Sequence, residues 1–255
     1  MIKIENISKS FGDKQVLKNI SAEFEQGKTN LIIGQSGSGK TIMMRICTGL
    51  LEPDEGEVYF NDRRFSNLPE SKRRDIRKEM GVLFQGGALF DSMTVEENVM
   101  FPLNMFTKMS RSEKLDRVNF CLKRVNLENS NKLRTNELSG GMMKRVAIAR
   151  AIANNPKYLF CDEPNSGLDP KTSELIDELI SEITEEYNIT TIVNTHDMNS
   201  VMGIGENIIF ICKGRAEWQG TNKEIMDAEN KKLEDFIFAS DILRQVKMAH
   251  DNERH

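Results

Sequence analysis

The sequence predicts an α/β fold built on a mostly parallel β-sheet that is covered on both faces. Residues 158–212 alternate short apolar strands with helical segments, and the apolar strand 31–33 leads straight into a glycine-rich loop. Between about 85 and 155 the strand signals stop and helical patterns dominate. Strands that alternate with helices of this length normally pair in parallel. The helical stretch is therefore expected to be an insertion into the sheet domain.

The individual elements follow from hydrophobic periodicity and from glycine and proline breaks. Strands are expected at 2–5, 20–24, 31–33, 57–60, 81–84, 158–161, 190–193 and 208–212. Helices are expected at 41–51, 95–106, 113–125, 142–154 and 171–187. Residues 1–225 then form one domain with a helical part at about 86–155, and residues 226–255 form a helical tail.

The tail carries apolar residues whose packing partner the sequence leaves open. Between Lys231 and Met248 they fit one helical face or two short ones. They are Leu233, Phe236, Ile237, Ile242, Leu243 and Val246. This face could pack on its own domain, or it could contact a second copy of the chain or another protein.

Composition argues against nucleic acid as a partner. The 35 Lys and Arg residues are balanced by 39 Asp and Glu residues, a net charge of −4, whereas domains that bind nucleic acid are usually strongly basic.

The four cysteines are scattered in apolar stretches, which predicts buried free thiols in a reducing compartment; they are Cys47, Cys121, Cys161 and Cys212. The sequence shows no apolar run long enough for a signal peptide or a transmembrane helix, so we expect a cytoplasmic protein.

Residues 34–41 fit the phosphate-binding pattern G-x-x-x-x-G-K-[ST]. In such a loop the glycines allow backbone N–H groups to turn inward around phosphates, at the positive end of the following helix. Lys40 is expected to reach the β- and γ-phosphates of a nucleotide, and Thr41 to offer its hydroxyl to Mg²⁺. The other nucleotide-binding candidates in the loop are Gly34, Ser36, Gly37, Ser38 and Gly39.

Two acidic residues, Asp162 and Glu163, end the apolar strand 158–161. Ligands of open α/β sheets bind at the carboxyl ends of strands, so both carboxylates are candidates for the site. Asp162 is expected to hold Mg²⁺ through water, and Glu163 to be the general base that polarises the attacking water. An acidic pair after a strand is more often an ordinary solvated loop, and the glycine-rich loop upstream is what favours catalysis. His196 follows another strand end and is a third candidate.

The chain resembles ATP-binding cassette (ABC) transporter ATPases through four motifs that stand in the order seen in that family. They are the loop 34–41, the signature Leu138-Ser139-Gly140-Gly141-Met142, the strand end Cys161-Asp162-Glu163-Pro164, and Asn194-Thr195-His196-Asp197. The resemblance covers roughly residues 2–225. It implies a P-loop NTPase fold, with a RecA-like, mostly parallel sheet core, an N-terminal antiparallel β-subdomain and an inserted helical subdomain. It also implies ATP and Mg²⁺ as ligands and ATP hydrolysis as the activity.

The resemblance assigns roles to further residues. His196 would contact the γ-phosphate and help to position the water, and Gln85 would sense Mg²⁺ and the transported load. Phe11 would stack on adenine. The family usually has tyrosine at this position, but phenylalanine can replace it because stacking uses only the ring face. Val16 belongs to the same nucleotide site. Asn165 stands in the loop after the acidic pair, where threonine or serine is commoner.

The signature motif implies a homodimer, because in this family two chains associate head to tail. Ser139, Gly140 and Gly141 of one chain would contact the γ-phosphate held by the partner's Lys40, so that two ATP molecules are buried between the subunits. Met142 replaces the usual glutamine, a departure that should cost a polar contact.

The stretch 82–99 is the most specific part of the resemblance. Its LFQGGALF sequence is similar to that of the ATPase of the bacterial phospholipid (Mla) transporter, which maintains outer-membrane lipid asymmetry. The implied partners are an integral membrane permease of the MlaE type, a small STAS-type accessory subunit and a lipid-binding MCE-domain subunit. The ATPase would then lie on the cytoplasmic face of the inner membrane.

In the family, the region after Gln85 contacts the coupling helix of the permease. Leu89, Phe90, Met93 and Val95 of this stretch could equally be core residues of the helical part. An importer ATPase for amino acids or another small solute stays open as the alternative, because the same motor serves many loads. Cassette ATPases that act on DNA or ribosomes would need a coiled-coil insertion or two cassettes, and this sequence has neither.

Overall fold

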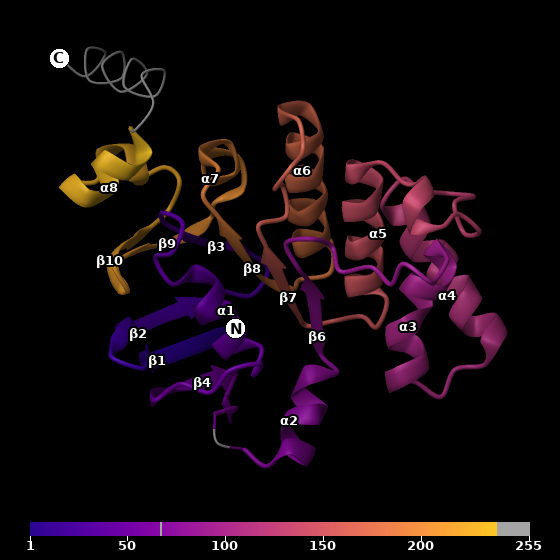
Figure 1. The fold of residues 1–255 in the computed structure, drawn as a ribbon, viewed down its shortest axis with the longest axis horizontal. Coiled ribbons are helices and arrows are strands. Elements are labelled where there is room, and N and C mark those ends of the chain that lie inside the picture. Colours follow the sequence, from indigo (N-terminus) through magenta and orange to yellow (C-terminus); the bar gives the residue numbers. More distant parts are fainter. Residues whose placement is uncertain (67, 239–255) are drawn as a thin grey trace.

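The computed structural model describes residues 1–66 and 68–238, which form two β-sheets with helices packed around them (Figure 1). The four-stranded sheet has the order β2-β1-β4-β5, and the six-stranded sheet has the order β10-β9-β3-β8-β7-β6. The strands are β1 (Ile2–Phe11), β2 (Lys14–Phe24), β3 (Thr29–Ile33), β4 (Glu55–Phe60), β5 (Arg63–Arg64), β6 (Met80–Leu83), β7 (Tyr158–Asp162), β8 (Thr190–Thr195), β9 (Asn207–Cys212) and β10 (Arg215–Gly220). The helices are α1 (Lys40–Cys47), α2 (Glu70–Arg77), α3 (Val95–Phe106), α4 (Arg111–Arg124), α5 (Gly140–Ile152), α6 (Pro170–Glu186), α7 (Met198–Ile204) and α8 (Lys231–Ile237), with short 3₁₀ turns η1 (Thr135–Glu137) and η2 (Ile225–Asp227).

The predicted mostly parallel sheet is confirmed. Strands β6, β7, β8, β3 and β9 pair in parallel, and β10 joins β9 antiparallel at one edge. Ile33 pairs with Thr195, and Asp162 pairs with Asn194, so the carboxyl ends of β3, β7 and β8 lie at one level. Since the nucleotide-site candidates follow these strand ends, the register brings them to one edge of the sheet.

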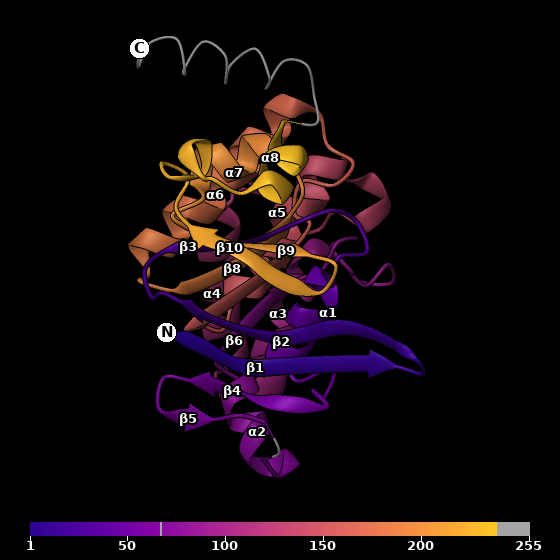
Figure 2. The same ribbon diagram turned by 90° about the vertical axis from the view of Figure 1, so that its left-hand side faces the viewer.

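Alternate residues of the central strands face two separate cores, which explains why these strands are apolar throughout. Leu31 and Ile33 of β3 belong to a core shared with α3–α8, whereas Ile32 belongs to a core shared with α1 and the antiparallel sheet. Figure 2 shows the antiparallel strands on one side of the six-stranded sheet and α6, α7 and α8 on the other. The sheet is thus covered on both faces, and the N-terminal antiparallel sheet is itself one of the two covers.

The expected helices between β6 and β7 are present as α3, α4 and α5, which lie beyond the β6 edge of the sheet (Figure 1). Capping boxes start two of them, Thr94 with Glu97 at α3 and Ser110 with Glu113 at α4. Between β6 and β7, the described residues form no strand and only one isolated β-bridge, which pairs Thr94 with Arg134. The division of the chain into domains 1–225 and 226–255 stays a prediction.

The structure corrects several element boundaries. Helix α1 ends at Cys47 and not at residue 51, because the chain turns at Gly49, which has φ +71°. Strands β1 and β2 extend to residue 11 and from residue 14, which makes one long hairpin. The sequence missed β5, α2, α7 and β10. They are short or polar: α2, for example, buries only Ile76.

The described part of the tail packs on its own domain. Leu233 and Ile237 of α8 are buried in the helical core, and the Phe236 ring stacks on Phe210 with centroids 5.3 Å apart. The other tail residues of the predicted apolar face lie outside the described residues; they are Ile242, Leu243 and Val246. Within residues 1–66 and 68–238, helices of the length and apolarity that a bilayer crossing requires do not occur.

All four cysteines lie in the described residues and are free thiols. Cys47, Cys121 and Cys161 are buried as expected, whereas Cys212 is only partly buried. Burial raises the pKa of Cys121 to about 11 and that of Cys47 to about 12. These two thiols therefore stay protonated and unreactive at neutral pH.

Candidate functional site

The glycine-rich loop joins β3 to α1 at the carboxyl edge of the parallel sheet. Gly34 and Gly39 have φ values of +150° and +116°, which side chains rarely adopt, and a Cβ on Gly34 would lie 2.2 Å from the carbonyl oxygen of Ile211. Lys40, the first residue of α1, donates from Nζ to the carbonyl oxygen of Gly34 at 2.8 Å. Ser38 Oγ is buried and has no hydrogen-bond partner among the described residues. The loop is therefore wrapped tightly around the lysine, with the helix N-terminus behind it.

The β1–β2 hairpin borders this loop. A Cβ on Gly39 would lie 2.6 Å from Cδ2 of Leu17 and 3.4 Å from the carbonyl oxygen of Val16, so β2 passes directly against the loop. Phe11 is at the end of β1 in the same hairpin and is 48% exposed, with Lys9 Nζ 5.7 Å from its ring centroid. An exposed aromatic ring in the hairpin that borders the phosphate-binding loop can offer its face to a flat ligand.

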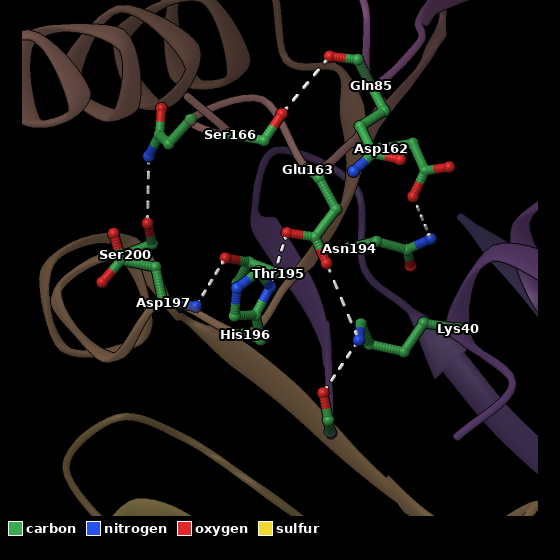
Figure 3. A network of polar contacts seen from close by, with 12 residues as sticks. Lys40, Gln85, Asp162, Glu163, Ser166, Asn194, Thr195, His196, Asp197 and Ser200 are labelled. Atoms are coloured by element: carbon green, nitrogen blue, oxygen red, sulfur yellow. Dashed lines mark hydrogen bonds and ion pairs between the residues drawn. The ribbon is translucent and has the colours of Figure 1, made fainter. Parts of the chain in front are cut away.

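The Glu163 carboxylate lies between two nitrogen-bearing side chains (Figure 3). Its Oε1 is 3.7 Å from Lys40 Nζ, and its Oε2 is 2.7 Å from His196 Nδ1. The backbone supports this position: Glu163 has φ +50°, an uncommon value for a residue with a side chain, and its N–H donates to the carbonyl oxygen of Asn194 at 3.0 Å. Burial lowers the pKa of Lys40, and the Glu163 carboxylate opposes that effect.

Oxygen atoms suited to a hard cation gather beside Glu163. The Thr41 hydroxyl is 3.3 Å from Asp162 Oδ1, which also accepts from Asn194 Nδ2 at 2.9 Å. The Gln85 side chain extends from the end of β6 toward Asp162 in the same view (Figure 3). Among the described residues, no three His, Cys, Asp or Glu side chains cluster as a metal site. One carboxylate with a hydroxyl is a donor set that fits Mg²⁺, which keeps most of its waters.

The signature residues occupy a different surface of the chain. Ser139 caps α5 by accepting from the Met142 N–H at 3.3 Å. A shallow depression there is lined by Ser139, Gly140, Gly141, Met142, Arg145 and residues 167–169. A second depression is lined by Gln35, Ser36, Glu163 and His196. In one chain, the signature motif and the phosphate-binding loop therefore line two neighbouring depressions that share Gly167. Met142 packs partly into the helical core, as an apolar residue should.

Sequence reasoning missed several polar residues of the site. Asn194, which holds Asp162, could have been found because it stands at the end of β8 beside His196. Lys144 of α5 and Asp177 of α6 carried no sequence signal, since both occupy helical positions that are usually solvated or apolar. The structure buries both side chains.

Comparison with known proteins identifies the family. Residues 17–166, well over half of the chain, match the family model for ABC transporter ATPases, described as "ABC transporter". The chain belongs to this family. The predicted family and fold class are thereby confirmed, and the protein is an ABC-type ATPase that binds ATP.

Two groups of relatives are similar to this ABC ATPase over most of its length. The methionine import ATP-binding protein MetN of Campylobacter jejuni is 38% identical over 95% of this chain and 77% of the relative. The intermembrane phospholipid transport ATP-binding protein MlaF of Haemophilus influenzae is 33% identical over 93% of this chain and 90% of the relative. MetN is thus at least as similar to this chain as MlaF.

Solved structures of the bacterial ABC transporter cassette MJ0796 share the fold. Its dimeric structure has a TM-score of 0.81 at 38% identity, covering 87% of this chain and 99% of the cassette. A dimeric post-hydrolysis structure of MJ0796 bound to ADP and Pi has a TM-score of 0.80 at 37% identity, again covering 87% of this chain and 99% of the cassette.

A buried acid links a loop and a helix of this ABC ATPase. Asp177 of α6 is 6% exposed and lies beside Ser200 and Asn165, and Asn165 Nδ2 donates to Ser200 Oγ at 3.1 Å. Burial, with a smaller contribution from the Asp197 charge, raises the pKa of Asp177 to about 6. Asp177 thus joins the loop that follows Glu163 to the helix that follows His196.

We expect Asp177→Asn to stabilise the protein at pH 8. The folded chain holds a proton on Asp177 that the unfolded chain releases between about pH 4 and 6, so the contribution of this group to stability falls as the pH rises through that window. Above it, the buried carboxylate costs about 3 kcal/mol, part of which the amide avoids. Urea unfolding at pH 4 and pH 8 should show an advantage of about 1–2 kcal/mol for the variant at pH 8 that shrinks at pH 4. An advantage that does not change with pH would contradict this account.

Proposed function

We propose that this ABC ATPase hydrolyses ATP with Glu163 as the general base and His196 as the residue that orients it and the γ-phosphate. The observation that carries the proposal is the position of the Glu163 carboxylate, 3.7 Å from Lys40 Nζ and 2.7 Å from His196 Nδ1. A base for the attacking water must lie beside the γ-phosphate, and Lys40 is the residue that would hold this phosphate. The proposed general base therefore lies beside the lysine that would bind the γ-phosphate.

The remaining site residues would bind different parts of the nucleotide. Phe11 and Val16 hold the adenine end, and the loop 34–41 holds the phosphates; its members are Gly34, Ser36, Gly37, Ser38, Gly39, Lys40 and Thr41. Thr41, Asp162 and Gln85 would hold Mg²⁺, the first directly and the acid through water. The ion supplies charge neutralisation at the phosphates.

A second copy of the chain would complete the site. Ser139, Gly140 and Gly141 line one depression, whereas Glu163 and His196 line another, and Gly167 borders both. The capped start of α5 favours an anion, because its N–H groups and helix dipole point outward there. Head-to-tail association would bring this helix start to the partner's ATP, and the related MJ0796 cassette forms a dimer.

Glu163→Gln is expected to lower kcat for ATP hydrolysis at least about 100-fold, because the amide cannot accept the proton of the attacking water. ATP binding remains, so the variant should accumulate as an ATP-bound dimer in light scattering. Glu178→Gln, on the exposed face of α6, is the matched control and should behave as wild type. Normal turnover in Glu163→Gln would remove Glu163 from the role of base.

Lys40→Ala is expected to abolish measurable ATP binding. The buried ammonium is the main positive charge inside the loop, and its loss leaves the γ-phosphate facing the Glu163 carboxylate without compensation. Titration with a fluorescent ATP analogue measures the affinity, with the exposed Lys28→Ala as control. An unchanged Kd would contradict the assignment of the loop.

For the cargo, we infer that the chain energises phospholipid transport through a membrane permease. The support is the LFQGGALF sequence after β6, together with the similarity to MlaF. The loop exposes Phe84 and Phe90, at 41% and 39%, whereas Val95 is buried, so the apolar residues of this stretch divide between surface and core. Exposed aromatic residues on an anchored loop suit a protein contact. The permease, the STAS-type and MCE-domain subunits and a place on the cytoplasmic face of the inner membrane belong to the same proposal.

Import of methionine or another small solute is the second candidate, favoured by the 38% identity to MetN. Purification of the native complex distinguishes the two, because the membrane subunit and any copurified lipid are read directly by mass spectrometry. A permease of the MlaE type with bound phospholipid is the expected result. A permease of the amino-acid type without lipid would overturn the phospholipid proposal and leave the ATPase assignment intact.

A further inference from the structure

Lys144 on the signature helix α5 is a buried cation whose partners are all neutral oxygens. Its side chain is 6% exposed, and Nζ donates to the carbonyl oxygen of Gln85, to the carbonyl oxygen of Glu163 at 3.4 Å and to Ser166 Oγ at 3.4 Å. An ammonium group has three N–H donors, and here each has an acceptor. The three acceptors come from the end of β6, the end of β7 and the loop after Glu163.

The three segments also contact one another at this point. The Ser166 hydroxyl donates to the same Gln85 carbonyl at 3.4 Å (Figure 3), and the Ser166 N–H donates to the Glu163 carbonyl at 3.2 Å. Lys144 therefore closes a small hydrogen-bonded junction of Gln85, Glu163 and Ser166.

Stability does not explain why a lysine occupies this position. Removing an ammonium from water is costly, and burial lowers the pKa of Lys144, while the Glu163 carboxylate acts in the opposite direction. An apolar side chain of similar volume would avoid that cost. What it would not do is hold two backbone carbonyls and a hydroxyl in fixed positions around one point.

The same helix holds the next residues of the loop through a second cation. Arg150 donates to the carbonyl oxygens of Gly87 and Ala88, both at 2.7 Å. Arg150 therefore reaches the loop alone, whereas Lys144 reaches the loop, the base and Ser166. This difference makes Arg150 the matched comparison for Lys144.

We propose that Lys144 is a positioning residue for ATP hydrolysis: by holding the backbone of Gln85 and Glu163 and the hydroxyl of Ser166, it sets the base and the glutamine relative to the signature helix. Gln85 and Glu163 follow the ends of two paired strands, β6 and β7, although they are 78 positions apart in the sequence. Lys144 is the side chain that ties their loops to α5. The proposal rests on the roles proposed above for Glu163 and Gln85.

Lys144→Met removes the ammonium and keeps the length of the side chain. We expect kcat for ATP hydrolysis to fall on the order of 10- to 100-fold, because a base displaced by about 1 Å loses that much. The Kd for ATP should stay within about threefold of wild type, because Lys144 does not touch the phosphate-binding loop. Lys123→Met, whose side chain is 75% exposed on α4, is the surface control.

Hydrogen–deuterium exchange separates positioning from general support of the fold. In Lys144→Met, amides of residues 85–88 and 163–166 should exchange faster, and those of β8 should not change. In Arg150→Met, only residues 85–88 should exchange faster. Faster exchange at 163–166 in Arg150→Met as well would overturn the specific role of Lys144.

Other outcomes are equally decisive. A kcat for Lys144→Met within about twofold of wild type overturns the proposal, and so does a parallel loss of kcat, ATP affinity and melting temperature. If Lys144→Met does not fold, Lys144→Gln serves the same test with the same two readings. Glu163→Gln, assayed alongside, separates the two proposals: its full activity would remove the base role itself, whereas its inactivity with an active Lys144→Met would remove only the role of Lys144.

Discussion

The whole site depends on the parallel register of β3, β8 and β7. The pairings of Ile33 with Thr195 and of Asp162 with Asn194 end the three strands at one level. As a result, the loop after Ile33, the acid after Asp162 and the histidine after Thr195 all emerge at the same edge. A shift of one residue in either pairing would turn each following side chain to the opposite face of the sheet. The two apolar cores that clamp the central strands are therefore what keeps Glu163 between Lys40 and His196.

The backbone at Glu163 shows what this position costs. A residue with a side chain at φ +50° carries of order 1 kcal/mol of strain, which persists only where the surroundings over-determine it. Here they do, because the N–H bonds to the Asn194 carbonyl and the carbonyl accepts from Lys144 and from the Ser166 N–H. With this backbone the Glu163 carboxylate lies between Lys40 and His196, and its side chain is 13% exposed.

The sequence predicted much of the fold because the relevant signals are local. The strand, loop and helix around Lys40 lie within a few consecutive residues, and all three are present in the structure. Strands at 2–5 and 20–24 were predicted, but the rest of the β1–β2 hairpin, α2 and β10 were missed because their strength lies in pairing and ion pairs, which leave little periodicity. Asp177 and Lys144 were missed for a stronger reason. The local sequence predicts that a charged residue on a helix is exposed to solvent. Whether distant loops bury it depends on tertiary contacts, which the local sequence does not contain.

The loop between β6 and α3 is anchored at both ends, which bears on how a motor of this family could be driven. Lys144 and Arg150 hold its first residues, and the fully buried Asn98 holds the Phe90 backbone by accepting from its N–H at 2.8 Å. Phe84, which precedes the first anchored residue, and Phe90, whose backbone Asn98 holds, are both exposed, and they are the residues proposed to meet a permease. Because one set of anchors belongs to the helix that starts with Ser139, a displacement of the exposed aromatic residues would be passed through these hydrogen bonds to the signature helix and to the Glu163 backbone. An unanchored loop would change its own conformation under the same displacement, and the ATP site would not respond.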